Sequence, residues 1–238
     1  MPVRSEGTAV AGFPGGVRLR LDLRESLQRD YLFGLYDRFE LDFVRRHLLG
    51  GGDFVDVGAH IGMYTVAAAL ALRDRGRVLA FEPNPTARLQ LEENVRVNGC
   101  DNVIVSGRAV ADAVGETFLH VPDTPDPSFS SLEAGRFSEG EGVRVETTTL
   151  DCELEAVGLR PVMVKVDVEG SELRVLAGME RTLDARPVLL VEVSAESRGQ
   201  LELRLERLGY RAFRVAHRRV RPGLAGGRGI FNALFLPD

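Results

Sequence analysis

The fold is decided by a strand, a glycine-containing turn and the start of a helix, which follow one another in residues 53–65, DFVDVGAHIGMYT. The short apolar run 54–57 is typical of a buried strand, and residues 63–72 form a helical segment rich in Ala and Leu. Two glycines across such a turn let a ligand approach the backbone, and the free N–H groups of the following helix favour a carboxylate or a phosphate. The order of these elements predicts a ligand site at the turn.

A regular alternation of strands and helices follows this turn. Strands are predicted at residues 77–81, 102–106, 162–167 and 188–193, and helices at 84–98, 171–183 and 196–208. This alternation indicates a parallel sheet covered by helices. The last two predicted strands, 211–215 and 230–236, have a Gly-rich loop and no helix between them, so they should pair antiparallel. We therefore expect an α/β fold with a mostly parallel seven-stranded sheet and a C-terminal antiparallel hairpin, the shape of Rossmann-like class I methyltransferases.

Two segments do not follow this alternation. Residues 1–16 predict a loose start, 17–23 an edge strand, and 31–49 one or two amphipathic helices. We expect residues 1–50 to be an N-terminal extension packed on a core domain of residues 51–238. Residues 108–150 predict an excursion beside the sheet edge, with short strands around a mobile loop near 123–142.

Composition narrows the class of protein. The 238 residues carry 30 basic and 35 acidic side chains, a net charge of −5, which argues against a general nucleic-acid coat. The longest apolar run, residues 66–72, is too short to cross a bilayer, and the N-terminus lacks the pattern of a signal peptide. Two cysteines cannot build a disulfide framework or a cysteine-rich zinc site. The expected location is therefore the cytoplasm.

Acidic residues mark the carboxyl ends of four predicted strands, where open parallel sheets bind ligands. They are Asp56, Glu82, Asp167 and Glu192. S-adenosylmethionine fits this crevice, because its carboxylate suits the helix start at 62–65, its ribose suits Glu82 and its cationic groups suit acids. The turn has the spacing G-x-x-x-G instead of the dinucleotide fingerprint G-x-G-x-x-G, which disfavours NAD. The alternative is that acids stand at exposed strand ends by chance.

Six motifs together resemble the FkbM-type S-adenosylmethionine-dependent methyltransferases, in that family's order and over about residues 35–236. They are the stretches 56–65 (DVGAHIGMYT), 81–85 (FEPNP), 109–112 (AVAD), 130–132 (SSL), 149–151 (TLD) and 165–170 (KVDVEG). The first and the last are the most specific. The family usually has Asn where this chain has His60.

The resemblance implies methyl transfer, usually to oxygen, on small molecules, natural-product intermediates or sugars. It implies a cofactor site built around the glycine turn and the two strand ends beside it. The expected cofactor-binding residues lie in this turn and along the rim formed by the strand ends. They are Asp56, Gly58, Ala59, His60, Gly62, Tyr64, Thr65, Glu82, Pro83, Asn84 and Asp167. Ala109 and Val110 would flank the adenine, and Ser130 and Ser131 would lie near the methionine end or the substrate.

The expected catalytic residues are Asp167, Glu169, Lys165, Glu192 and His60. Asp167 and Glu169 are candidates for acceptor contact or for a general base, the alternative being carboxylates that stabilise a helix start. Lys165, the only lysine, lies within an apolar strand and should pair with Asp167 or another crevice acid, either to orient it or as a structural ion pair. His60 is a candidate base or acceptor contact, or simply a loop residue.

Several alternatives stay open on the sequence. We expect no metal site, but Asp167, Glu169 and Glu192 offer the oxygen ligands that Mg²⁺ prefers. The rival functions are an NAD-dependent oxidoreductase or epimerase and a non-catalytic S-adenosylmethionine-binding module. The expected acceptor is a small-molecule or sugar hydroxyl, with no nucleic acid and no membrane as partner. The amino-methylating motif N/D-P-P-Y/F is missing after the strand at 162–167, which disfavours methylation of base amino groups in nucleic acid. Apolar positions within 31–49 permit a homodimer.

Overall fold

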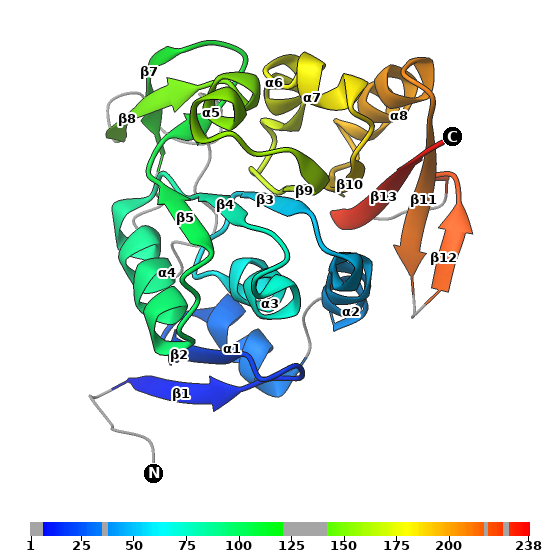
Figure 1. Cartoon of the computed structure of the whole chain (residues 1–238). Helices are drawn as coiled ribbons and strands as arrows, with labels where there is room; N and C mark the ends of the chain where they lie inside the picture. The colour runs from blue at the N-terminus through cyan, green and yellow to red at the C-terminus, as the bar shows by residue number, and fades with distance from the viewer. Residues whose placement is uncertain (1–6, 35–37, 121–141, 217–218, 226–228) are drawn as a thin grey trace.

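An eight-stranded sheet between two layers of helices forms the body of the chain (Figure 1). The computed structural model describes residues 7–34, 38–120, 142–216, 219–225 and 229–238. The strands of the sheet lie in the order β12-β11-β13-β10-β9-β3-β4-β5. Their bounds are β3 Asp53–Val57, β4 Val78–Phe81, β5 Val103–Ser106, β9 Pro161–Val166, β10 Val188–Val193, β11 Tyr210–Ala216, β12 Arg219–Pro222 and β13 Phe231–Pro237.

The seven predicted strands are present with the predicted directions. Strands β10, β9, β3, β4 and β5 pair parallel, and β13 runs antiparallel between β10 and β11. This is the class I methyltransferase arrangement expected from the sequence. The interpretation of the segment after β11 as loop alone is wrong in one part, because β12 adds an eighth, edge strand. Its Val220 and Arg221 fit an edge strand, where a charged side chain discourages further pairing.

Helices cover the two faces of the sheet separately. On one face lie α2 Arg38–His47, which continues into the 3₁₀ turn η1 Leu48–Gly50, α3 Met63–Leu72 and α4 Pro85–Val97; on the other lie α5 Leu150–Val157, α6 Glu172–Ala177, α7 Glu180–Asp184 and α8 Arg198–Arg207 (Figure 1). Side-chain alternation assigns the strand residues to these faces: Val55 and Val57 pack in the core beneath α5–α8, and Phe54 packs in the core beneath α2 and α3.

Two helix predictions need correction. The single helix predicted over 171–183 is two short helices, α6 and α7, separated at Gly178, whose α-carbon lies so close to the Ala111 carbonyl that a β-carbon would overlap it. Helix α5 was not predicted. It begins after Thr149, whose hydroxyl accepts a hydrogen bond from the Cys152 N–H and so caps the helix.

The N-terminal residues form a ribbon and a helix. Strands β1 Thr8–Gly12 and β2 Arg18–Asp22 pair antiparallel, and α1 Ser26–Phe33 follows. The predicted edge strand is thus present as β2, whereas the expectation of a loose start is wrong for β1, which pairs with it. We call residues 18–33, which comprise β2 and α1, the N-terminal arm.

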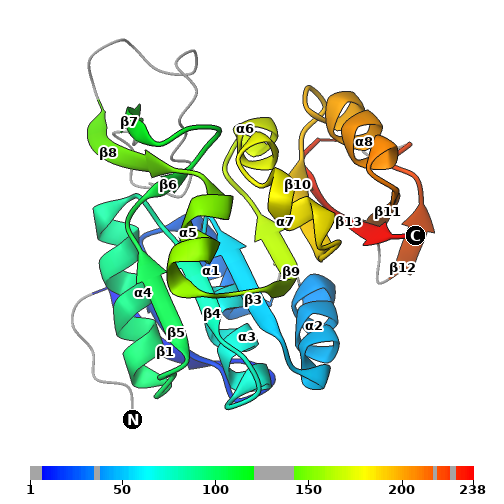
Figure 2. The ribbon, with the colours of Figure 1, turned by 45° about the horizontal axis from the view of Figure 1, so that its top comes forward.

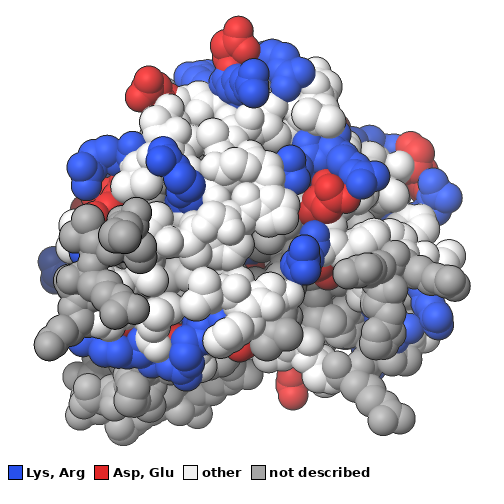
Figure 3. Space-filling model, turned by 90° about the horizontal axis from the view of Figure 1, so that it is seen from below, with Lys and Arg blue, Asp and Glu red and all other residues white. Residues whose placement is uncertain are grey.

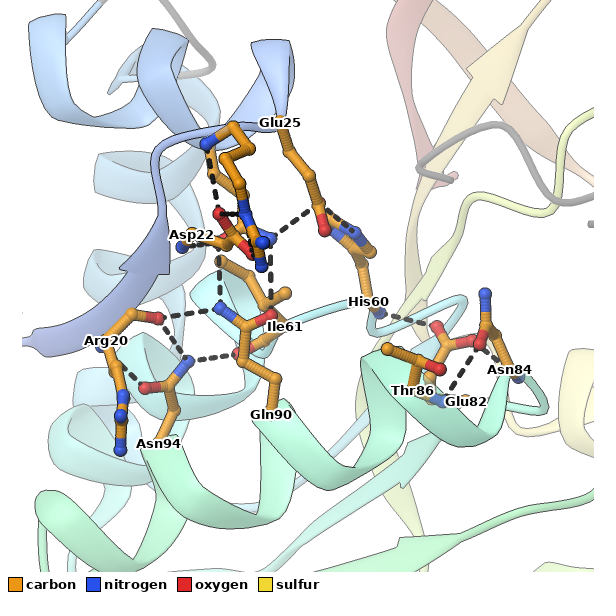
Figure 4. Close-up of polar contacts among 12 residues, drawn as sticks. Arg20, Asp22, Glu25, His60, Ile61, Glu82, Asn84, Thr86, Gln90 and Asn94 are labelled. Carbon is orange, nitrogen blue, oxygen red and sulfur yellow. Dashed lines mark hydrogen bonds and ion pairs between the residues drawn. The ribbon is translucent and has the colours of Figure 1, made fainter. Parts of the chain in front are cut away.

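The free edge of β2 is bound by side chains of helix α4. The N–H and C=O groups of Arg18 pair with the amide of Asn98 at 2.9 and 2.6 Å, and the N–H of Arg20 donates to Asn94 Oδ1 at 2.7 Å. Four residues of helix rise about 6 Å and two residues of strand about 6.8 Å, so amides four apart on α4 meet alternate residues of β2. Figure 4 shows part of this row of contacts.

The excursion between β5 and β9 is a small sheet of its own. Strands β6 Ala109–Val110, β7 Gly115–Leu119 and β8 Val143–Thr148 form three strands in the order β6-β8-β7, near the end of β5 and beside α5 (Figure 2). The short strands predicted here are confirmed. The predicted mobile loop, with Ser130 and Ser131, lies almost wholly outside the described residues. Within the described part of the chain, no helix is both long and apolar enough to cross a bilayer.

Candidate functional site

A cleft with a cavity volume of about 100 Å³ opens at the carboxyl ends of β3, β4 and β9. Most of the predicted site residues line it: Gly58, Ala59, His60, Tyr64, Glu82, Pro83, Asn84, Ala109, Val110, Lys165, Asp167 and Glu169. The strand ends and the excursion therefore converge where the topology of a parallel sheet expects a ligand.

The other predicted residues lie elsewhere. Asp56 and Thr65 are fully buried behind the cleft wall, where the Thr65 hydroxyl donates to Asp56 Oδ2 at 2.6 Å. Gly62 shapes the turn without lining the cleft, and Glu192 lies beside Asp167 and Glu169. Asp56 and Thr65 thus support the wall from within.

The two glycines of the turn are required by close backbone approach. Gly58 has φ +80°, and a β-carbon there would overlap the carbonyl oxygen of Asp167. Gly62 has φ +91°, and a β-carbon there would lie 2.5 Å from Leu91 Cδ1. The Gly58 turn therefore lies directly against the end of β9, and both segments line the cleft.

Glu82 is the acid at the end of β4, and backbone groups hold both of its oxygens. The His60 N–H donates to Oε2 at 2.7 Å and the Asn84 N–H donates to Oε1 at 2.9 Å (Figure 4). Burial raises the pKa of Glu82 to about 7, although these two N–H groups oppose the shift. A carboxylate has about four lone-pair positions, so each oxygen can still accept a ligand hydroxyl.

His60 adopts φ +49°, an uncommon conformation for a residue other than glycine. Asn and His are among the few residue types enriched in this region. This gives a physical reason why His stands where the resemblance leads one to expect Asn. The structure places the His60 imidazole at the N-terminal arm, 4.0 Å from Glu25 Oε2.

Lys165 joins the acids of two strands beneath the cleft. Its ammonium lies 2.8 Å from Asp167 Oδ2, 3.9 Å from Asp56 Oδ1 and 4.8 Å from the centre of the Tyr64 ring. The predicted pairing with Asp167 is therefore present, and Asp56 takes part as well. Burial raises the pKa of Asp56, while the Lys165 charge and the Thr65 hydroxyl oppose the shift. The side chain of Lys165 is only 3% exposed, so the pair is held away from water.

Asp167, Glu169 and Glu192, which we call the acid cluster, come together at the edge of the cleft. One oxygen of each lies within 4.8 Å of the others. Burial and the charges of Asp167 and Glu169 raise the pKa of Glu192 far above its usual range. Neighbouring oxygen ligands of octahedral Mg²⁺ lie about 3 Å apart, so the cluster would have to contract to hold that ion.

The N-terminal arm supplies a wall of the cleft that the sequence analysis missed. Leu27 and Tyr31, one helical turn apart on α1, line it beside Met63. Their spacing marks them as one face of a helix, but no local signal indicates which cavity that face covers.

The chain is similar in sequence to known methyltransferases. The model of the methyltransferase FkbM domain matches residues 56–212. The hexuronic acid methyltransferase AglP of Haloferax volcanii is 32% identical over 142 residues, which is 59% of this chain and 55% of AglP. The 2-O-methyltransferase NoeI of Sinorhizobium fredii is 28% identical over 167 residues, 63% of this chain and 67% of NoeI. The match to AglP thus spans little more than half of that protein.

A solved structure gives the fold independently. The crystal structure of an rRNA methylase from Streptococcus thermophilus superimposes with a TM-score of 0.50 at 11% identity, over 83% of this chain and 93% of that one. At this identity the likeness concerns the fold alone. The family match covers the glycine turn, the Glu82 strand end, Lys165 and the acid cluster. On that match, the chain belongs to the FkbM methyltransferase domain family.

Proposed function

We propose that this chain transfers the methyl group of S-adenosylmethionine to a hydroxyl of a small molecule or sugar. The observation that carries the proposal is the cleft in which the Gly58 turn, the Glu82 carboxylate and the Lys165–Asp167 pair meet. AglP is named for methylation of a hexuronic acid and NoeI for methylation at a 2-oxygen, and both support a sugar hydroxyl as the acceptor.

The residues of the cleft fit the cofactor. Gly58 and Ala59 of the turn line the cleft, so a ligand there lies against the turn. Glu82 would receive the ribose hydroxyls, and Ala109 and Val110 offer an apolar surface for the adenine. When bound, S-adenosylmethionine supplies a methyl group activated by its sulfonium charge.

The acid cluster would hold the acceptor and its proton. Methyl transfer to a hydroxyl needs alignment of the acceptor oxygen, and it gains from a base that receives the proton. The raised pKa of Glu192 keeps this residue protonated near neutral pH, so the proton acceptor would be Asp167 or Glu169. Lys165 keeps Asp167 in place through its 2.8 Å contact.

The proposal also includes the domain organisation, the cellular location and the oligomeric state of the protein. Residues 1–50 act as an extension packed on a methyltransferase domain of residues 51–238, in the cytoplasm and without a nucleic-acid substrate. Homodimerisation would use the face of α1 and α2, where Phe33 is 70% exposed. Seen from the side of β1 and β2, the molecule shows a broad uncharged area bordered by charged side chains (Figure 3).

Calorimetric titration with S-adenosylhomocysteine and with NAD tests the cofactor. We expect micromolar binding of S-adenosylhomocysteine, no binding of NAD, and much weaker but still measurable binding of S-adenosylhomocysteine in Glu82→Ala. Turnover of S-adenosylmethionine is then measured with hexuronic acids and with their 2-deoxy analogues as acceptors. Binding of NAD instead would refute the proposal, and tight binding of S-adenosylhomocysteine without turnover on any hydroxylated acceptor would favour a non-catalytic binding module.

A further inference from the structure

Glu25 stands at the point where the N-terminal arm meets the glycine turn. It directly precedes α1, and its side chain is only 13% exposed. Its Oε2 atom accepts a hydrogen bond from Gln28 Nε2 at 2.6 Å and lies 4.0 Å from Nε2 of His60, whose side chain is 19% exposed (Figure 4). The carboxylate therefore has a fixed partner on its own helix and an ion-pair partner in the turn whenever His60 is protonated.

His60 contacts the arm and the cofactor site through different atoms. Its imidazole faces Glu25, and its backbone N–H donates to Glu82 Oε2 at 2.7 Å. The imidazole and this N–H belong to one residue, so a contact that holds the side chain also restricts the backbone donor. Because φ at His60 is +49°, the residue has few other backbone conformations that keep the hydrogen bond.

The next residue of the turn is bound to the same arm. Asn94 is fully buried, accepts the Arg20 N–H at 2.7 Å, and donates to the carbonyl of Ile61 at 2.8 Å (Figure 4). Two consecutive turn residues, His60 and Ile61, are thus connected to the arm, one through Glu25 and one through Asn94. The arm and the turn are expected to move as one unit.

From these contacts we propose that Glu25 is a positioning residue of the cofactor site. Acting through His60, it holds the Glu82 carboxylate in the orientation that receives the ribose hydroxyls of S-adenosylmethionine. The inference rests on the proposed function. Leu27 and Tyr31 of the same arm line the cleft, so a bound cofactor and a docked arm stabilise each other by equal amounts.

The test compares two ligands in matched variants. The ligands are S-adenosylhomocysteine and its 2′,3′-dideoxy analogue, which lacks the hydroxyls that Glu82 would receive. In Glu25→Gln we expect about fivefold weaker binding of S-adenosylhomocysteine, the size of a favourable ion pair, and unchanged binding of the analogue. Glu93→Gln is the control, because it removes the 2.6 Å ion pair with Arg20 in the same arm without touching the turn, and it should change neither affinity.

A double-mutant cycle separates positioning from general support of the fold. If Glu25 acts through Glu82, then Glu25→Gln has no further effect in a Glu82→Ala background. Equal loss of both ligands in Glu25→Gln, or additive effects in the cycle, would overturn the inference. If Glu25→Gln does not fold, His60→Asn provides the second variant, since it removes the imidazole and keeps the backbone donor; it should show the same selective loss. Failure of the unaltered protein to bind S-adenosylhomocysteine would instead overturn the proposed function, and the inference with it.

Discussion

Replacing Lys165 by Met removes the ammonium that lies between two acids and keeps a side chain of similar length. Asp56, which is fully buried, would lose the charge 3.9 Å from its Oδ1 atom, and Asp167 would lose its 2.8 Å partner. Removing one partner of a buried ion pair typically costs about 3–5 kcal/mol. The Asp56 side chain can limit this cost only by binding a proton.

The free energy needed to protonate Asp56 determines how much stability Lys165→Met loses and how that loss depends on pH. Protonating a carboxyl of ordinary pKa costs about 4 kcal/mol at pH 7 and about 1.5 kcal/mol at pH 5. Burial already raises the pKa of Asp56, and loss of Lys165 removes the charge that opposes this shift. The folded variant therefore binds more protons than the unfolded chain, so its stability falls as pH rises from 5 toward 8. We expect Lys165→Met to lower the free energy of unfolding by about 3 kcal/mol at pH 7 and by about half as much at pH 5.

Urea denaturation of both proteins at pH 5, 6, 7 and 8 measures the difference. A loss below about 1 kcal/mol that does not change with pH would contradict the buried pair as described. Lys165→Arg is the matched charged variant. Its larger, planar guanidinium does not fit beside the Tyr64 ring, so it should lose stability and activity. Full activity and unchanged stability of this variant would show that a compact ammonium is not required.

Three further outcomes follow from the site. Because the pKa of Glu82 is about 7, protonation of Glu82 should weaken S-adenosylhomocysteine binding below pH 7, by up to about tenfold per pH unit. In Glu82→Gln, calorimetry should give an affinity that does not change over the same pH range. Gly58→Ala places a β-carbon on the Asp167 carbonyl at φ +80° and should cost about 3 kcal/mol of stability, so a melting temperature equal to that of the unaltered protein would contradict this geometry. Exhaustive chelation with EDTA should leave methyl transfer intact, because Lys165 already pairs with Asp167 of the acid cluster at 2.8 Å; loss of activity that only added Mg²⁺ restores would show that the cluster binds the ion.

The sheet could be predicted from the sequence because its strands carry strong local signals. The apolar runs at 54–57, 162–166 and 188–193, each followed by turn residues and a helical pattern, permit little besides a parallel sheet. Strand β12 and the break at Gly178 could not be predicted in the same way. Strand β12 depends on its pairing with β11, which exists only in the folded chain. The break at Gly178 depends on the approach of the Ala111 carbonyl, which is distant in the sequence.

Some residues of the candidate site could likewise be predicted from the sequence and others could not. Glu82, Asp167 and Glu169 could be predicted because a parallel sheet brings the ends of its strands to one edge. Leu27, Tyr31 and Glu25 could not, since no local signal in residues 18–33 indicates that the N-terminal arm packs across the cleft. Their positions depend on amide side chains of α4 that a sequence pattern does not distinguish from ordinary helix-surface residues.

The amide row of α4 has a consequence for association between molecules. A strand edge with unpaired N–H and C=O groups invites pairing with another chain. In β2 that edge is covered by Asn94 and Asn98, whose amides occupy the N–H groups that an added strand would need. The row binds backbone rather than side chains, so Arg18 and Arg20 can be exchanged for other residues while the cover stays in place. Loss of the two asparagines would instead expose the N–H groups of β2 to pairing with another chain. The first effect would be self-association at high protein concentration.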